Sequence, residues 1–272
     1  MYIAGIDIGG TTVKIGIFDL NYQLIEKWEI KTKDNILKDI YSSIKDKYDL
    51  SRIKGYGFGI PGVVIDNKII VTPNIKIETS ACEIFKELVK NENVFLANDA
   101  NVAALGEAMN QKLDSAIFIT LGTGVGGGIV INGQIHEGFG GSAGEFGHLK
   151  KYSDIKCNCG GIGCLETVCS AKALEKMAGV STKEIFKNTA LYSDILSNFY
   201  DKLGLAIANI LAVVNTENVI IGGGLSNAKD ELLNGIYESF KKHAFLPLLN
   251  TSFRLSSLFN DAGIYGAAYL VR

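Results

Sequence analysis

The chain has 272 residues, of which 47% are hydrophobic and 21% charged, and it contains 31 glycines but only 3 prolines. This composition is typical of a soluble globular protein and excludes a largely disordered or fibrous chain. The formal net charge is −2, so no overall positive field would attract nucleic acid or an anionic membrane. We therefore expect no nucleic-acid partner.

The first 20 residues include Asp7, Lys14 and Asp19 and lack the basic start and apolar core of a secretory signal. We therefore expect a cytoplasmic protein. Residues 115–135 carry no charge and are long enough to span a bilayer. The six glycines in this stretch disfavour a helix, so we expect no membrane association.

The chain opens with the pattern of a β-hairpin. An apolar run over residues 3–8 is followed by a Gly-Gly-Thr-Thr turn and an alternating segment over residues 13–18. A shift of 113 positions places Ile6, Ile8 and Gly9 on Ile119, Leu121 and Gly122. A similar hairpin is therefore expected in the second half, which suggests an internal duplication.

Strands and helices alternate along the rest of the sequence. Apolar spacing predicts helices over 36–48, 100–109, 164–178, 203–214, 230–243 and 264–271, and strands over 53–60, 94–97 and 219–221. Such alternation is typical of α/β layers. We expect two α/β lobes with mixed sheets flanked by helices and a cleft between them. One lobe would comprise residues 1–114, completed by a helix at about 258–272, and the other residues 115–257.

Two glycine-rich turns are candidate phosphate sites. The first contains Asp7, Gly9, Gly10, Thr11, Thr12 and Lys14. Its glycines let backbone amides approach an anion, and its carboxylate is a candidate Mg²⁺ ligand. The second contains Gly122, Thr123 and Gly124, and the predicted strand after it excludes the dinucleotide fingerprint, which requires a helix. Two such turns predict a polyphosphate held from two sides, and the alternative is a pair of flexible hairpin turns.

Asn98 and Asp99 lie where a predicted strand ends and a helix begins. One of them could simply cap the helix. Ligands also gather at the carboxyl ends of strands in α/β proteins, and a carboxylate there could accept the proton of a hydroxyl that attacks a phosphate. Chain position alone leaves both interpretations open.

Three thiols within eight residues follow a histidine. His148, Cys157, Cys159 and Cys164 have the ligand types and spacing of a tetrahedral Cys₃His zinc site. A disulfide is the alternative, but a cytosolic chain and a Cys-x-Cys spacing disfavour it. A fully ligated zinc would be structural and would order a loop over residues 148–164.

Together these segments resemble the ROK family of repressors and sugar kinases, which have the ribonuclease-H-like, actin-like ATPase fold. The resemblance covers nearly the whole chain and rests on residues 7–14, 59–62, 72–74, 98–101, 121–128, 144–148, 157–166, 218–224 and 266–268. The Cys-x-Cys-Gly-x-x-Gly-Cys-x-Glu pattern is the most specific of them. Some relatives have a Gly-Trp pair after Asn74 where this chain has Ile75 and Lys76, so that wall of the sugar pocket is expected to differ.

The resemblance implies an ATP-dependent hexose kinase in which Asp99 is the general base for attack of a sugar hydroxyl, at C6, on the γ-phosphate of MgATP. It implies that the sugar is bound by Gly62, Asn74, Asn98, Asp99, Glu145, His148 and Glu166. Both turns would then face the phosphates, and Gly222, Gly223 and Gly224 would border the nucleoside. His148 would serve zinc through one ring nitrogen and the sugar through the other.

Glucose is the expected substrate, with N-acetylmannosamine, N-acetylglucosamine and fructose as alternatives, and relatives suggest a homodimer. An alternative of another class is a sugar-responsive transcription regulator. Such regulators carry a helix-turn-helix before the first phosphate turn, and here only six residues precede Asp7. A catalytically silent assembly protein or an actin-like ATPase is a third hypothesis.

Overall fold

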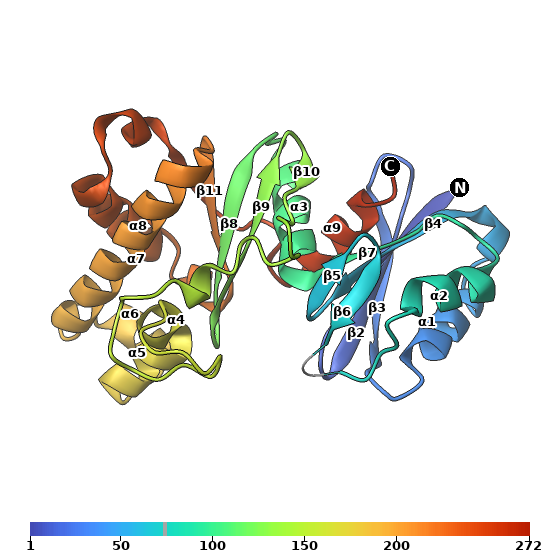
Figure 1. Ribbon diagram of the computed structural model, residues 1–272, viewed down its shortest axis with the longest axis horizontal. Helices are drawn as coiled ribbons and strands as arrows, with labels where there is room; N and C mark the ends of the chain where they lie inside the picture. The colour runs from blue at the N-terminus through green and yellow to red at the C-terminus, as the bar shows by residue number, and fades with distance from the viewer. Residues whose placement is uncertain (73–74) are drawn as a thin grey trace. The chain divides into compact units, whose positions relative to one another are not determined.

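The computed structural model describes residues 1–72 and 75–272 and contains two five-stranded sheets (Figure 1). The first sheet has the order β3-β2-β1-β4-β7. Its strands are β1 (Tyr2–Ile8), β2 (Thr12–Phe18), β3 (Leu24–Lys31), β4 (Ile53–Ile60) and β7 (Val94–Asn98). The first three strands are antiparallel neighbours, and β4 and β7 continue the sheet parallel to β1.

The second sheet repeats this order as β10-β9-β8-β11-β12. Its strands are β8 (Ala116–Leu121), β9 (Val125–Ile131), β10 (Gln134–Ile135), β11 (Asn218–Gly222) and β12 (Ser252–Leu255). Here too β11 is parallel to the hairpin's first strand and β12 is parallel to β11. The two sheets thus have the same strand order, as the repeated hairpin in the sequence predicts. The α/β class expected from the sequence is also confirmed. A separate small hairpin pairs β5 (Val63–Ile65) with β6 (Lys68–Val71).

The helices are α1 (Ile36–Lys45), α2 (Ala81–Val89), α3 (Asp99–Asn110), α4 (Glu166–Cys169), α5 (Ala171–Ala178), α6 (Thr182–Lys187), α7 (Ser193–Val214), α8 (Lys229–His243) and α9 (Ala262–Tyr269). Among the described residues, no helix is both long and apolar enough to cross a membrane. The uncharged stretch over residues 115–135 forms β8, β9 and β10 instead.

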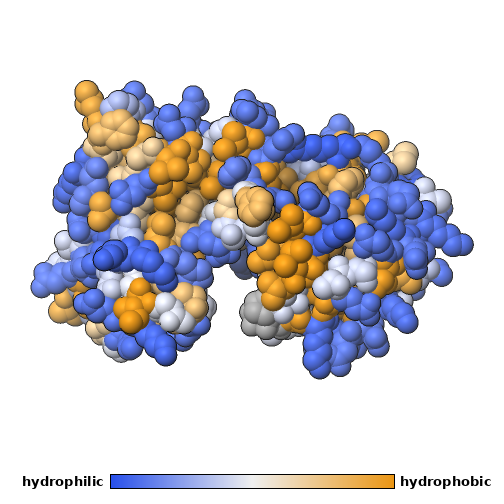
Figure 2. Space-filling view, in the orientation of Figure 1, coloured by the Kyte–Doolittle hydropathy of each residue, from blue (hydrophilic) through white to orange (hydrophobic). Residues whose placement is uncertain are grey.

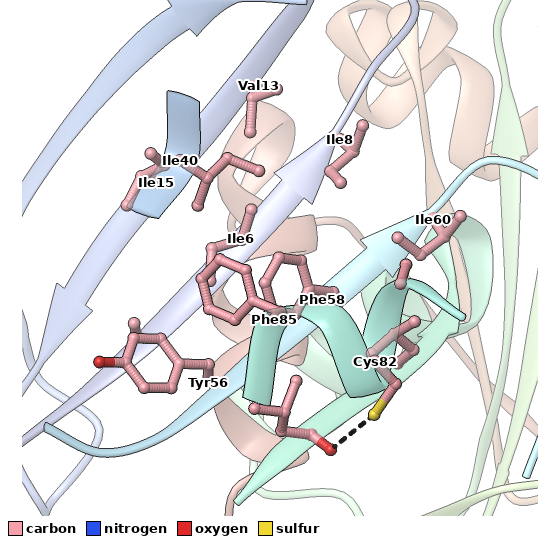
Figure 3. Close-up of a cluster of buried hydrophobic side chains, with 14 of the residues drawn as sticks. Ile6, Ile8, Val13, Ile15, Ile40, Tyr56, Phe58, Ile60, Cys82 and Phe85 are labelled. Carbon is pink, nitrogen blue, oxygen red and sulfur yellow. Dashed lines mark hydrogen bonds between the residues drawn. The ribbon is translucent and has the colours of Figure 1, made fainter. Parts of the chain in front are cut away.

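Alternation along β1 assigns its two faces to different helices. Ala4, Ile6 and Ile8 belong to the core that α1 and α2 share with the sheet (Figure 3). Ile3 packs on the other face with residues of α9. Because successive side chains of a strand point to opposite faces, Asp7 lies on the α9 side, and this places a carboxylate beside the start of that helix.

The chain divides by its internal contacts into two compact units. The first unit comprises Met1–Asp114, Gly128–Ala143 and Asn260–Arg272, and the second comprises Ser115–Gly127 and Gly144–Phe259. The sequence-based boundary assigned all of 115–257 to the second lobe. The contacts instead group Gly128–Ala143, which includes β10 and most of β9, with the first unit.

One predicted helix is in fact two. Residues 164–178 form α4 and α5, separated by Ser170. Ser170 has an extended backbone (φ −95°, ψ 161°), and its hydroxyl accepts a hydrogen bond from the amide of Ala173. This bond caps α5 and competes with continuation of α4.

The surface in Figure 2 is mostly hydrophilic, with an apolar patch over β5 and β6. Ile70 and Val71 of β6 are each about half exposed.

Candidate active site

The first glycine turn connects β1 to β2 and is held in place by three hydrogen bonds that involve Gly9, Thr11, Thr12 and Thr32. The amide of Gly9 donates to the carbonyl of Thr12 (2.9 Å), and the hydroxyl of Thr32 donates to the carbonyl of Gly9 (2.7 Å). The amide of Thr32 also donates to the carbonyl of Thr11 (3.0 Å). A Cβ built on Gly10 would meet no atom within 4 Å. The turn is therefore fixed in shape and has open space at its tip for a ligand.

Asp7 sits in a tight space at the end of β1. A Cβ on Gly263 of α9 would lie 2.4 Å from its Oδ2, and a Cβ on Gly59 of β4 would lie 3.4 Å from its Oδ1 and 3.6 Å from the Cα of Asp99. The β1–β2 register pairs Asp7 with Lys14. Burial, and next the charge of Asp99, raise the pKa of Asp7 to about 6, and Lys14 opposes them. A cation bound here would relieve this cost.

Lys14 is fixed by the segment before α9, because its ammonium donates to the carbonyl of Asn260 (2.7 Å). The lysine therefore extends along this side of the sheet.

Asn98 and Asp99 both take part in starting α3. Asn98 is the N-cap: its Oδ1 accepts from the amide of Asn101 (3.1 Å), and its Nδ2 donates to the carbonyl of Gly62 (2.8 Å). Oδ1 of Asp99 accepts from the amide of Ala100 (2.8 Å), which orients the carboxylate. Gly62 has φ +141°, and a Cβ there would lie 2.1 Å from the carbonyl oxygen of Val71, so only glycine fits. Asn74 lies outside the described residues.

The second glycine turn connects β8 to β9 and is supported by α4 and α5. The amide of Gly122 donates to the carbonyl of Gly124 (3.0 Å), and the carbonyl of Gly122 accepts from the amide of Ala171 (2.8 Å). A Cβ on Gly124 would lie 2.7 Å from Oε2 of Glu166, whereas one on Gly122 would meet nothing within 4 Å. Glu166 therefore packs directly on this turn.

The four expected metal ligands are gathered at one point. His148, Cys157, Cys159 and Cys164 each offer a ligand atom, and these atoms all lie within 4.8 Å of one another. The sulfurs of Cys159 and Cys164 are 3.5 Å apart, and that of Cys157 is 3.9 Å from Nδ1 of His148. A tetrahedral zinc with bonds of about 2.3 Å needs sulfurs about 3.8 Å apart. The cluster therefore fits zinc, and all five cysteines are free thiols.

His148 has two ring nitrogens with different neighbours. Nδ1 faces the sulfur of Cys157, and Nε2 lies 3.9 Å from Oε2 of Glu145. Cys157 also donates to Oε1 of Glu166 (2.9 Å). The structure thus brings Glu145, His148 and Glu166 together around the cluster.

The glycines after β11 differ in what they contact. A Cβ on Gly222 would lie 2.6 Å from the ring of Phe118, and Gly223 has φ +80° and lies against the backbone of Leu121. Gly224 faces a cavity of about 560 Å³, which Phe186, Lys183 and Lys187 of α6 also line. The sequence did not point to these α6 residues, because no motif distinguishes them from an ordinary amphipathic helix.

The two sheets share one strand order, and each has a glycine turn between the first two strands of its long hairpin, β1–β2 and β8–β9. The model of the ROK family matches residues 3–272. The chain belongs to the ROK family, as the sequence motifs predicted.

Individual relatives match over the full length. The chain is 35% identical to a glucokinase of Halalkalibacterium halodurans, with 100% of this chain and 95% of that protein covered. The crystal structure of a ROK hexokinase from Thermus thermophilus matches with a TM-score of 0.87 at 27% identity and covers 100% of this chain and 98% of that one. A ROK glucokinase from Streptomyces griseus, solved with glucose and AMPPNP, matches with a TM-score of 0.77 at 26% identity over 100% and 99% of the two chains.

Proposed function

We propose that the chain is an ATP-dependent hexose kinase that transfers the γ-phosphate of ATP to the C6 hydroxyl of glucose. The observation that carries the proposal is the full-length similarity to a glucokinase, in a chain whose own Asp7 and Asp99 both lie close to Gly59. The glucokinase solved with glucose and AMPPNP supports both substrates.

Asp99 is the proposed general base. The bond from the amide of Ala100 orients its carboxylate. The carboxylate would accept the proton of the C6 hydroxyl as that oxygen attacks the γ-phosphorus, while the bond to the β-phosphate oxygen breaks and ADP leaves. Positioning and charge stabilisation account for most of the rate in phosphoryl transfer. Asn98, Gly62, Asn74, Glu145, His148 and Glu166 are the proposed sugar ligands.

The phosphates would be bound by the amides of the two glycine turns, with Lys14 and the hydroxyls of Thr11, Thr12 and Thr123 as further donors. The carboxylate of Asp7 would hold Mg²⁺, directly or through water. When bound, this ion neutralises phosphate charge. The cavity at Gly224 and Phe186 would take the nucleoside.

His148, Cys157, Cys159 and Cys164 would hold a structural zinc. A closed four-ligand site orders its loop without taking part in the reaction. Through His148 it would position Glu145 near the sugar. Cys157 would bind zinc as a thiolate, so its hydrogen bond to Glu166 belongs to the metal-free thiol. Free thiols fit a reducing compartment, which supports a cytoplasmic location. We also propose that the chain forms a homodimer, and analytical ultracentrifugation of the purified protein would test this oligomeric state.

The decisive experiment compares Asp99→Asn with Asp34→Asn, a control at an exposed carboxylate. ADP release is measured across glucose, fructose, N-acetylglucosamine and N-acetylmannosamine. The Asp99 variant should lose about 10²–10⁴-fold in kcat, the usual share of a general base. Its affinity for ATP, measured by calorimetry, should be unchanged. Unchanged kcat would reject the role of Asp99, and a higher kcat/KM for another sugar would reject glucose.

A further inference from the structure

A lysine lies against the sulfurs of the proposed metal site, in addition to its four ligands. The ammonium of Lys150 is 2.8 Å from the sulfur of Cys164 and 3.6 Å from that of Cys159. Cys164 is fully buried. Although Lys150 is exposed as a residue, its charged tip therefore contacts a sulfur that water does not reach.

Gly161 provides the space for this ammonium. A Cβ on Gly161 would lie 2.3 Å from Nζ of Lys150 and 3.2 Å from its Cε. The neighbouring Gly160 and Gly163 have φ +87° and +82°, values that favour glycine, whereas Gly161 has no positive φ. The backbone conformation at position 161 would thus allow a residue with a side chain. Glycine is needed there because the ammonium of Lys150 fills the space that a Cβ would take.

The charge of the site explains why a cation would matter. Three thiolates, a neutral imidazole and Zn²⁺ sum to a charge of −1. Cys157 and Cys164 are buried, whereas Cys159 is exposed, and negative charge on buried sulfurs is unfavourable unless it is paired. N–H donation from a charged group to an anionic acceptor is among the stronger hydrogen bonds, and it makes the thiolate less available to electrophiles.

We propose that Lys150, seated on Gly161, is an outer partner of the metal site that neutralises the zinc–thiolate cluster and thereby strengthens zinc retention and protects the thiolates. This inference rests on the proposed zinc site, and it is independent of the sugar that the enzyme uses. Lys150 is a positioning residue and not a metal ligand.

The test compares Lys150→Met, which keeps the aliphatic stem, with Lys150→Arg and Lys151→Met. Lys151 is the adjacent exposed lysine, so its substitution removes the same charge from the same loop. Gly161→Ala is an independent variant that displaces the ammonium and keeps the lysine. Zinc affinity is measured by competition with a chromophoric chelator, and thiolate reactivity by the rate of N-ethylmaleimide labelling of the zinc-loaded protein.

Loss of an outer partner typically costs about 10–100-fold in metal affinity. Lys150→Met and Gly161→Ala should bind zinc at least about tenfold more weakly and label several-fold faster, with Lys150→Arg between them and wild type. Lys151→Met should stay within about twofold of wild type, since it removes only a solvent-screened charge. Circular dichroism of the zinc-loaded variants establishes that they are folded.

The outcomes separate the two proposals. Wild-type protein that binds no zinc overturns the metal site and this inference together. Wild-type protein that binds zinc with an affinity equal to that of Lys150→Met leaves the metal site standing and overturns the role of Lys150. An equal loss in Lys151→Met would also overturn it, because the effect would then be general loop charge.

Discussion

Substitution of Gly263 tests whether catalysis depends on the position of the Asp7 carboxylate, against which Gly263 packs. In Gly263→Ala the new Cβ would lie 2.4 Å from Oδ2 and 2.5 Å from Cγ of Asp7. Ordinary van der Waals contact needs roughly 1 Å more, and a misplacement of about 1 Å at an active site can cost about 10²-fold in rate. This loss corresponds to about 2.7 kcal/mol of transition-state stabilisation. Overpacking should lower the free energy of unfolding by about 1–3 kcal/mol, partly offset by the better helix propensity of alanine.

The assay is steady-state ADP release with glucose and MgATP, together with a urea melt of each variant. Gly140→Ala is the matched control, because the nearest atom to its new Cβ is Oγ of Ser142 at 3.9 Å. We expect kcat/KM to fall about 100-fold in Gly263→Ala while the variant stays folded, and to be unchanged in Gly140→Ala. Activity of Gly263→Ala within threefold of wild type would refute the reasoning that the position of Asp7 limits catalysis.

Four further predictions concern single groups. Burial beside Asp99 raises the pKa of Asp7 from 3.8 to about 6, so the folded state binds more protons between these values. Relative to Asp7→Asn, the wild type should therefore lose about 3 kcal/mol of unfolding free energy as the pH rises from about 3 to about 7; urea melts that show a pH-independent difference would contradict this. The phenol oxygen of Tyr56 is buried without a hydrogen-bond partner among the described residues, so Tyr56→Phe should leave stability unchanged or raise it by about 1 kcal/mol, and a loss above that in a urea titration would reveal a missed partner. Elemental analysis should find about one zinc per chain, and its removal by a chelator should lower the melting temperature reversibly; an unaffected melting temperature would argue against a structural metal. Phe186→Ala should raise KM for ATP about tenfold, the equivalent of about 1.4 kcal/mol of lost stacking, with KM for glucose unchanged, and an effect on glucose alone would place the nucleoside elsewhere.

Much of the fold could be predicted because its signals are local. The turn from residue 9 to residue 12 and the apolar run before it form the β1–β2 hairpin, and the shifted copy forms β8 and β9. The break at Ser170 was missed because apolar spacing continues through it. The signal was a serine three residues before Ala173, whose amide it caps, and a capping bond of this kind is too weak a pattern to outweigh periodicity from sequence alone.

The residues of the candidate site also fall into those that the sequence reveals and those that only the folded structure reveals. Cys157, Cys159 and Cys164 could be recognised because their ligand spacing is short. Gly263 and Lys150 act through contacts made only in the folded chain: Gly263 is more than 250 residues from Asp7, and Lys150 contacts Cys164 across the loop. No local pattern encodes such proximity, so these residues could not be found before the structure was known.

The side chain of Glu166 accepts a hydrogen bond from the metal-free thiol of Cys157, and its other oxygen occupies the space where a side chain on Gly124 would lie. It therefore joins the cysteine-rich loop to the glycine bend that is proposed to bind phosphate. If zinc and nucleotide bind as proposed and this side chain couples them, their affinities are thermodynamically linked. Linkage is reciprocal: whatever factor the metal adds to nucleotide affinity, the nucleotide returns to metal affinity. If the coupling is positive, a cell short of zinc would retain the ion longest in those copies of the enzyme that are occupied by ATP.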